Sequence, residues 1–311
     1  MNINNLKRDK NGRFVIDEKL DNVEYLPTGN NSIKFFFGDN KRYFGKCDSF
    51  VSTSDYEIFA SYLAEHIGLN AVKYYPSVFK VDGAEFNGVI CEDFTQNNKH
   101  AKIKSSWFYK DSNLPNTIEN QLMQIESYAY NLSKDQSKSY IFDKRKAQNE
   151  LLKLLIFDFC LLQADRAPRN IEYLIKQNGE NFEIELAPIF DNSAILCQEN
   201  SVAKKKVIEC LQNNNPLPEN IFDNKTYLLG INNKMDIKGI AKEIKRLQLF
   251  NPYVKTMLTK LKNIDFEAVK DKIKQENPNY KLPDGICEMT KGIINQTLSY
   301  MYYERQNLKQ F

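Results

Sequence analysis

The chain has few of the residues on which most metal and redox sites depend. Its 311 residues include only two histidines, His66 and His100, and neither stands in a partner motif, which disfavours a histidine-based triad or metal site. The six cysteines are scattered without Cys-x-x-Cys spacing, so neither zinc ligation nor a disulfide framework is indicated. We therefore expect free thiols in a reducing compartment.

Long apolar runs and an excess of one charge are also missing. No run of about 18 apolar residues occurs, so we expect no membrane span, and the first residues lack the apolar core of a signal peptide. The 43 basic and 40 acidic residues are interspersed, which argues against direct nucleic-acid binding. We expect a cytoplasmic protein, and the sequence leaves secretion into a host as an effector open.

The chain is rich enough in apolar residues to bury a full core, with 42% hydrophobic and 12% aromatic residues. Runs of aromatic and β-branched residues predict a β-rich N-lobe at 1–95, and helical patterns predict a mainly helical C-lobe at 96–311. The expected strands of the N-lobe are 13–17, 32–37, 42–47, 71–81 and 86–94. The expected helices of the C-lobe are 117–133, 143–164, 237–250, 252–263, 266–274 and 285–306.

One helix is expected within the N-lobe, at 58–67. Ser54 followed three residues later by Glu57 is a capping box, and Gly68 is suited to the left-handed position that ends a helix. A strand-rich lobe with one helix after its third strand is the plan of a kinase N-lobe.

The segment from 151 to 197 organises the second lobe. Residues 151–164 are apolar almost all round, which is typical of a buried helix, and Pro168 forbids its continuation. Two strands, 171–175 and 182–190, are expected to form a hairpin after it.

Asp165, Asn170 and Asp191 all fall at the ends of these elements. The Asp-x-x-x-x-Asn pattern, followed by a hairpin and an Asp, matches the catalytic half of a protein-kinase-like site. In such a site the first Asp accepts a proton from the attacking hydroxyl, while the Asn and the second Asp hold magnesium against ATP. The alternative is that Asp165 and Asn170 form turns and Asp191 ends a strand.

Lys46 at the end of a strand and Glu57 at the start of the next helix match the other half of such a site. A kinase lysine contacts the ATP phosphates, and a helix glutamate holds that lysine in place. Either residue alone is better explained as a solvated lysine or a capping glutamate. All five positions occur in the chain order that a kinase requires, which favours the interpretation of these residues as a kinase site.

These stretches resemble the HipA-like serine/threonine kinases, and in size the chain is most similar to the compact cell-translocating kinase A type. The resemblance covers about residues 25 to 200, and its most specific part is the Leu-Ala-Pro-hydrophobic-aromatic-Asp pattern that ends at Asp191. The stretches that carry it are YFGKC, EIFASYLAEHIGL, VICEDF, ADRAPRN and LAPIFDNSA. It implies an α+β, bilobal protein-kinase-like fold with magnesium and ATP bound between the lobes.

The resemblance also implies roles for individual residues. Lys46 would bind phosphate with Glu57 as its partner, and Asp165 would be the catalytic base. The remaining assignments are Asn170 and Asp191 as metal ligands, Gly29, Asn30, Asn31 and Ser32 as the phosphate loop, and Glu92, Asp93 and Phe94 beside the adenine. The implied activity is ATP- and magnesium-dependent phosphate transfer to a protein serine or threonine, with autophosphorylation, and an antitoxin or host protein is a further conceivable partner.

Some residues depart from the pattern of ordinary kinases. The phosphate loop offers a single glycine, although backbone amides still cradle phosphate and Asn tolerates left-handed backbone. Asn192 follows Asp191 where ordinary kinases have Phe, and the HipA-like group shares this difference. For Arg166 we expect a surface ion pair, or alternatively a bond to a phosphorylated loop.

Two other functions remain open at this point. The poor phosphate loop is compatible with a catalytically silent pseudokinase that acts as a binding module. The broader architecture is also shared by kinases of small molecules and lipids.

Overall fold

The computed structural model describes most of the chain. The described residues are 6–19, 23–27, 33–37, 42–48, 52–95, 100–104, 118–136, 138–163, 166, 170–196, 201–213, 215–217, 240–241, 244–245 and 252–307. They form two compact units, of which unit 1 comprises residues 1–100 and 265–284 and unit 2 comprises 101–264 and 285–311. The fold is α+β, as the sequence predicts.

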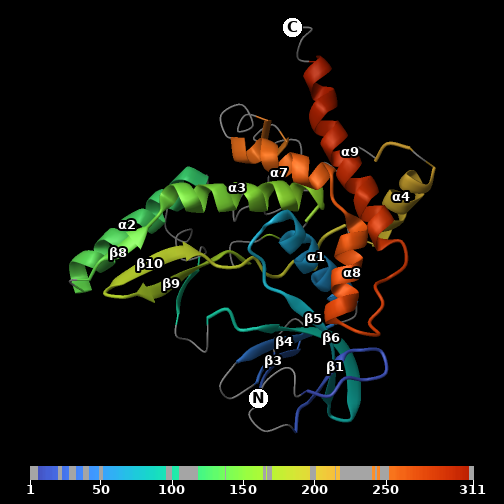
Figure 1. Cartoon of the computed structure of the whole chain (residues 1–311), viewed down its shortest axis with the longest axis horizontal. Coiled ribbons are helices and arrows are strands. Elements are labelled where there is room, and N and C mark those ends of the chain that lie inside the picture. Colours follow the sequence, from blue (N-terminus) through green and yellow to red (C-terminus); the bar gives the residue numbers. More distant parts are fainter. Residues whose placement is uncertain are drawn as a thin grey trace. The chain divides into compact units, whose positions relative to one another are not determined.

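Unit 1 is built on a six-stranded sheet in the order β1-β5-β6-β4-β3-β2, of which Figure 1 labels every strand except β2. Strands β1 and β5 are parallel and all other neighbours are antiparallel. The sequence predicts five of these strands, and the sixth, β2, ends in a proline that weakens the strand signal. The strands are β1 (Phe14–Asp17), β2 (Val23–Pro27), β3 (Ile33–Phe37), β4 (Tyr43–Cys47), β5 (Tyr74–Val81) and β6 (Ala84–Glu92).

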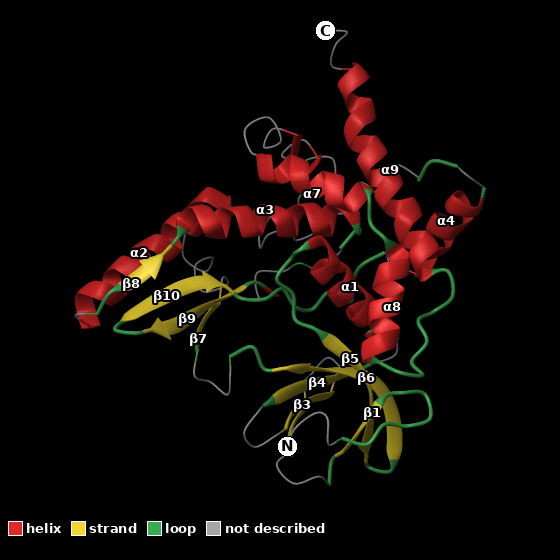
Figure 2. Ribbon diagram, in the orientation of Figure 1, coloured by secondary structure: helices red, strands yellow, loops and turns green. Residues whose placement is uncertain are grey.

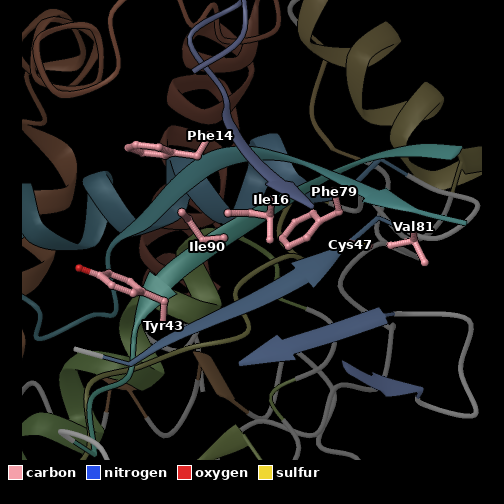
Figure 3. Close-up of a cluster of buried hydrophobic side chains, with 7 residues drawn as sticks. All are labelled: Phe14, Ile16, Tyr43, Cys47, Phe79, Val81 and Ile90. Carbon is pink, nitrogen blue, oxygen red and sulfur yellow. The ribbon is translucent and has the colours of Figure 1, made fainter. Parts of the chain in front are cut away.

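One face of this sheet carries an apolar cluster, drawn in Figure 3. Tyr43 and Cys47 of β4 both belong to it, and burial raises the pKa of the Cys47 thiol to about 12, so the thiol stays protonated. Because side chains alternate along a strand, Lys46 must point to the opposite face. The other members of the cluster are Phe14, Ile16, Phe79, Val81 and Ile90.

Helix α1 (Ser54–Ile67) is longer at its start than predicted, and its capping differs from the predicted box. Thr53 is the N-cap and its side chain makes no capping bond. Asp48 takes that role, because its Oδ1 accepts bonds from the amides of Thr53 at 3.0 Å and Ser54 at 2.9 Å. The side chain of Glu57 is thereby available for a different partner.

The predicted C-cap of α1 is present. Gly68 has a φ of 81°, and its amide and that of Leu69 donate to the carbonyls of Glu65 and Ala64, at 3.0 and 2.9 Å. This is the Schellman arrangement, for which glycine is the least strained residue.

Helix α8 (Phe266–Glu276) belongs to unit 1, whereas the sequence predicts a helix of the second lobe here. The reason is a polar contact with α1 that spans more than 200 positions of sequence. The Tyr62 hydroxyl donates to Glu276 at 2.9 Å and accepts from Asn277 at 2.9 Å, and Lys272 pairs with Glu65 at 2.6 Å. Such long-range pairs leave no local signal in the sequence.

Unit 2 combines a four-stranded sheet, in the order β7-β9-β10-β8, with helices (Figure 2). Strands β9 and β10 form the predicted antiparallel hairpin, while the short strands β7 and β8 are not predicted. The strands are β7 (Ala101–Lys104), β8 (Tyr140–Phe142), β9 (Glu172–Asn178) and β10 (Asn181–Leu186). The helices in the described part of unit 2 are α2 (Ile118–Gln136), α3 (Lys144–Cys160), α4 (Ser201–Gln212), α7 (Pro252–Lys262) and α9 (Ile286–Asn307).

Helix α3 is the buried helix that the sequence predicts, with Asp143 as its N-cap. It ends at Cys160, four residues before the predicted end, because Leu162 adopts a φ of 54° and the Gln163 amide turns back to the Asp158 carbonyl at 2.9 Å. Most of the helix predicted at 237–250 lies outside the described residues. Among the helices that the structure describes, none is long and apolar enough to cross a membrane.

Gly88 of β6 makes a packing contact that the strand bearing Lys46 depends on. A methyl group at this position would meet the backbone carbonyl of Lys46 and the ring of Phe79. We expect Gly88→Ala to lower the free energy of unfolding by about 1–3 kcal/mol, the usual cost of overpacking. Urea unfolding measures this loss of stability. Adding Phe79→Leu to the Gly88→Ala chain should recover part of the loss, because it removes the ring that the new methyl group meets. A Gly88→Ala chain as stable as the parent would contradict the close contact described here.

Candidate active site

Lys46 and Glu57 form an ion pair inside unit 1. The Lys46 ammonium lies 3.4 Å from Glu57 Oε1, and the Glu57 side chain is 1% exposed while that of Lys46 is 22% exposed. A buried carboxylate requires a partner, and the first turn of a helix further favours its negative charge. The pair therefore fixes the ammonium near the surface of the sheet, where it is still accessible to an anion.

The two predicted metal ligands of unit 2 flank the same end of the β9/β10 hairpin. Asn170 precedes β9, Asp191 follows β10, and the register pairs Leu186 with Tyr173 at this end. Asn170 is 5% exposed. Both side chains offer hard oxygen atoms, an amide and a carboxylate, and this donor set fits magnesium. Among the described residues no group of three or more His, Cys, Asp or Glu side chains suits a metal ion.

Arg166, the residue after Asp165, connects three segments around this end of the hairpin. Its guanidinium forms a bidentate pair with Asp158 of α3, at 2.9 and 3.0 Å, and both side chains are 0% exposed. It also donates to the Phe190 carbonyl at 2.6 Å and to Asn192 Oδ1 at 2.5 Å. The guanidinium thus binds the residues on both sides of Asp191.

The expected surface ion pair at Arg166 is therefore wrong. The side chain is fully buried, and its bonds run to α3 and to the segment after β10. The sequence signal for this burial is Asp158, the one acidic residue of the mainly apolar stretch 151–164 that precedes Arg166, since an acidic residue in a buried helix requires a partner. Burial raises the pKa of Asp158 even though the guanidinium opposes the shift.

Asp191 has a strained backbone. Its φ is 56°, in the left-handed region that side-chain-bearing residues rarely adopt, although Asp and Asn tolerate it better than most. Its carbonyl accepts a bond from Gln163 Nε2 at 3.2 Å, and the Arg166 bonds hold both neighbours. Strain that surrounding contacts maintain is commonest at functional sites, so this geometry favours a functional role for Asp191.

The remaining predicted residues are partly described. Asp165 and the phosphate-loop residues Gly29, Asn30, Asn31 and Ser32 lie outside the described part of the chain. Glu92 ends β6, and the amide of Asp93 donates to the Arg42 carbonyl at 2.9 Å, so this amide is already engaged within unit 1. Asp93 Oδ1 also accepts from the amide and hydroxyl of Thr95. These bonds set the turn that leads from β6 through Phe94.

No family model and no curated protein matches this sequence. The proinflammatory kinase CtkA of Helicobacter pylori is similar in structure, with a TM-score of 0.54 and 19% identity over 92% of this chain and 94% of CtkA. HipA of Shewanella oneidensis MR-1, solved in a toxin–antitoxin complex with HipB and operator DNA, gives 0.52 and 12% over 91% of this chain and 66% of HipA. The chain has the fold of the HipA-like kinases. The resemblance seen in the sequence is thereby confirmed at the level of the fold.

The buried pair makes a strong prediction for stability. In Arg166→Met the carboxylate of Asp158 is left buried without its cation, so we expect a loss of about 3–5 kcal/mol in the free energy of unfolding. Arg166→Lys should restore little of this stability, because a single ammonium group cannot form the two parallel bonds that the guanidinium makes to Asp158. Arg145→Met, on the exposed side of α3, is the matched control and should unfold as the parent does. Equal stability of the two methionine variants in denaturant titrations would exclude the structural role assigned to Arg166.

Proposed function

We propose that this chain is an ATP- and magnesium-dependent protein kinase that transfers the γ-phosphate to serine or threonine and autophosphorylates. The observation that carries the proposal is the Lys46–Glu57 ion pair at 3.4 Å, on the strand and helix where a HipA-like kinase fold requires it. The placement of Asn170 and Asp191 at one end of the hairpin supports it further.

Each residue has a distinct part in the proposed transfer. Glu57 holds the Lys46 ammonium, which contacts the ATP phosphates and offsets their charge. Asp165 orients the acceptor hydroxyl and takes its proton as the oxygen bonds to the γ-phosphorus and ADP leaves. Asn170 and Asp191 would hold magnesium, which when bound neutralises charge on the phosphoryl oxygens. Arg166 keeps the segments on either side of these groups in one arrangement.

The proposed partner is a protein with an accessible serine or threonine, and an antitoxin or a host protein is a second class of partner. The discriminating experiment incubates the protein with labelled ATP and magnesium, first alone, then with cell lysate and then with lipid vesicles. Label on the chain itself or on lysate protein supports the proposal. Label on lipid or on small molecules alone would replace it with a small-molecule kinase, and nucleotide binding without transfer would indicate a pseudokinase.

Replacement of the acidic groups of unit 2 should separate metal binding from proton transfer. We expect Asp191→Ala to abolish phosphate transfer, because it removes the only carboxylate of the proposed metal pair. We expect Asp165→Asn to slow transfer by roughly 10²–10⁴-fold, the usual contribution of a general base. Single-turnover assays with labelled ATP measure both rates, and full activity in either variant would remove its assignment.

The ion pair of unit 1 should matter for nucleotide binding. Glu57→Gln keeps the shape of the side chain and removes its charge, so the Lys46 ammonium loses its fixed position. We expect the Kd for ATP to rise about tenfold, which corresponds to about 1.4 kcal/mol. Glu85→Gln, on the exposed surface of β6, is the control. The assignment fails if calorimetry gives the same ATP affinity for both variants.

A further inference from the structure

Unit 1 contains a polar cavity of about 530 Å³ at the N-terminal end of α1. Five segments line it, namely the N-terminal turn, the connection that leads from β4 to α1 (Asp48 and Ser52), the start of α1, the β5/β6 pair and the segment that follows α8. Ile58 and Pro76 supply its aliphatic side chains, and Lys46 and Glu57 are not among the lining residues. The volume is typical of a site for a small molecule, while the lining is more polar than in most such sites.

Ser54 lines this cavity and has a buried hydroxyl group that lacks a hydrogen-bond partner. The residue is 6% exposed, and its Oγ has no partner in the structure. Leaving such a group unsatisfied costs about 1–3 kcal/mol. Ser61 on the same helix is also buried, but its hydroxyl donates to the Ile58 carbonyl at 2.8 Å and accepts from the Tyr74 amide at 3.3 Å. Of these two buried serines of α1, Ser61 therefore has hydrogen-bond partners for its hydroxyl, whereas Ser54, which lines the cavity, has none.

The charged groups around the cavity are of both signs. Arg13 is already paired with Asp9 at 2.6 Å. Lys10 and Lys281 are exposed, and within the described part of the chain neither has an ion-pair partner. On the acidic side, Asp48 and Asp55 also line the cavity.

The two carboxylates are hydrogen-bonded but lack a paired cation. Asp48 accepts from the amides at the start of α1, and Asp55 accepts from the Tyr280 hydroxyl, with no ion pair for either among the described residues. Burial raises the pKa of Asp55, a shift that a bound cation would reverse. A simple anion would meet these carboxylates, and a simple cation would meet the lysines. A ligand that carries both charges satisfies all four groups.

We propose that the cavity binds a small zwitterion of the α-amino-acid class. Its ammonium group lies against Asp48 and Asp55, its carboxylate lies against Lys10 and Lys281, and Ser54 Oγ bonds to it. Ser54 and Glu57 are three positions apart and so lie one turn apart on the same side of α1. A ligand that fixes the start of α1 therefore also fixes Glu57, and this regulatory part rests on the proposed kinase function.

The test uses the full chain and L-glutamine, which is a zwitterion with a neutral polar side chain. Calorimetry should show saturable binding of L-glutamine and none of acetate, ethylammonium or glycerol. In Ser54→Ala we expect the Kd to rise at least about tenfold. The same variant should unfold at equal or higher denaturant concentration, because the change removes a buried hydroxyl that has no partner.

Ser61→Ala is the matched control and should behave in the opposite way. It should be less stable, since the Tyr74 amide loses its acceptor, and it should bind L-glutamine with unchanged affinity. Absence of saturable binding, equal affinity in Ser54→Ala, or equal binding of acetate or ethylammonium would overturn the cavity assignment. These readouts need no catalysis, so they stand apart from the kinase proposal.

A second calorimetric titration tests the coupling to the kinase site. Saturating L-glutamine should lower the Kd for ATP, and Glu57→Gln should abolish that decrease. An ATP affinity that L-glutamine leaves unchanged would overturn the regulatory part. A chain that binds L-glutamine and does not bind ATP would refute the proposed function while the cavity assignment stands.

Discussion

The buried Arg166–Asp158 pair is the contact that fixes the segment carrying Asp191, and so the metal site proposed in unit 2 depends on it. Removing two charges from water is costly, and an apolar pair of similar volume is often as stable. The ionic pair fixes the orientation of the guanidinium. Because this planar group is bound by Asp158 through two of its nitrogens, its remaining N–H groups point to the Phe190 carbonyl and to Asn192 Oδ1. The left-handed backbone of Asp191 lies between those two acceptors, so the pair maintains a conformation that side-chain-bearing residues adopt only rarely.

Unit 1 fixes Glu57 by similar means, through contacts at both ends of a helix. Asp48 binds the first amides of α1, and Gly68 ends the helix in a Schellman turn. Along its length α1 is bonded to α8, where burial and the Glu276 carboxylate raise the pKa of Tyr62 and keep its hydroxyl protonated as a donor. Because these contacts fix both the position of α1 and its rotation about its own axis, the Glu57 side chain is directed to Lys46.

The sequence predicts those parts of the fold that local patterns determine. A run of aromatic and β-branched residues identifies β1, an apolar run identifies α3, and Gly68 marks the end of α1. The errors have a common physical cause, because each depends on a partner far away in the chain or on the loss of water. Ser54 and Glu57 satisfy the capping pattern, but Asp48 and Lys46 bind the same groups better. The local sequence around Arg166 is that of an ordinary surface cation, and its burial follows only from its pairing with Asp158, eight residues earlier.

The position of α8 has a consequence for how the two units form. The chain passes between the units after residue 100, before 265 and after 284, so unit 1 is complete only when the C-terminal part of the chain has been made. Without residues 265–284, Tyr62 would lose Glu276 and Asn277, and Asp55 would lose Tyr280. Buried polar groups that lose their partners are costly, so the first hundred residues alone cannot hold α1 as the full chain does. The position of Glu57, and with it the Lys46 pair, is therefore a property of the whole chain and not of an independent N-terminal domain.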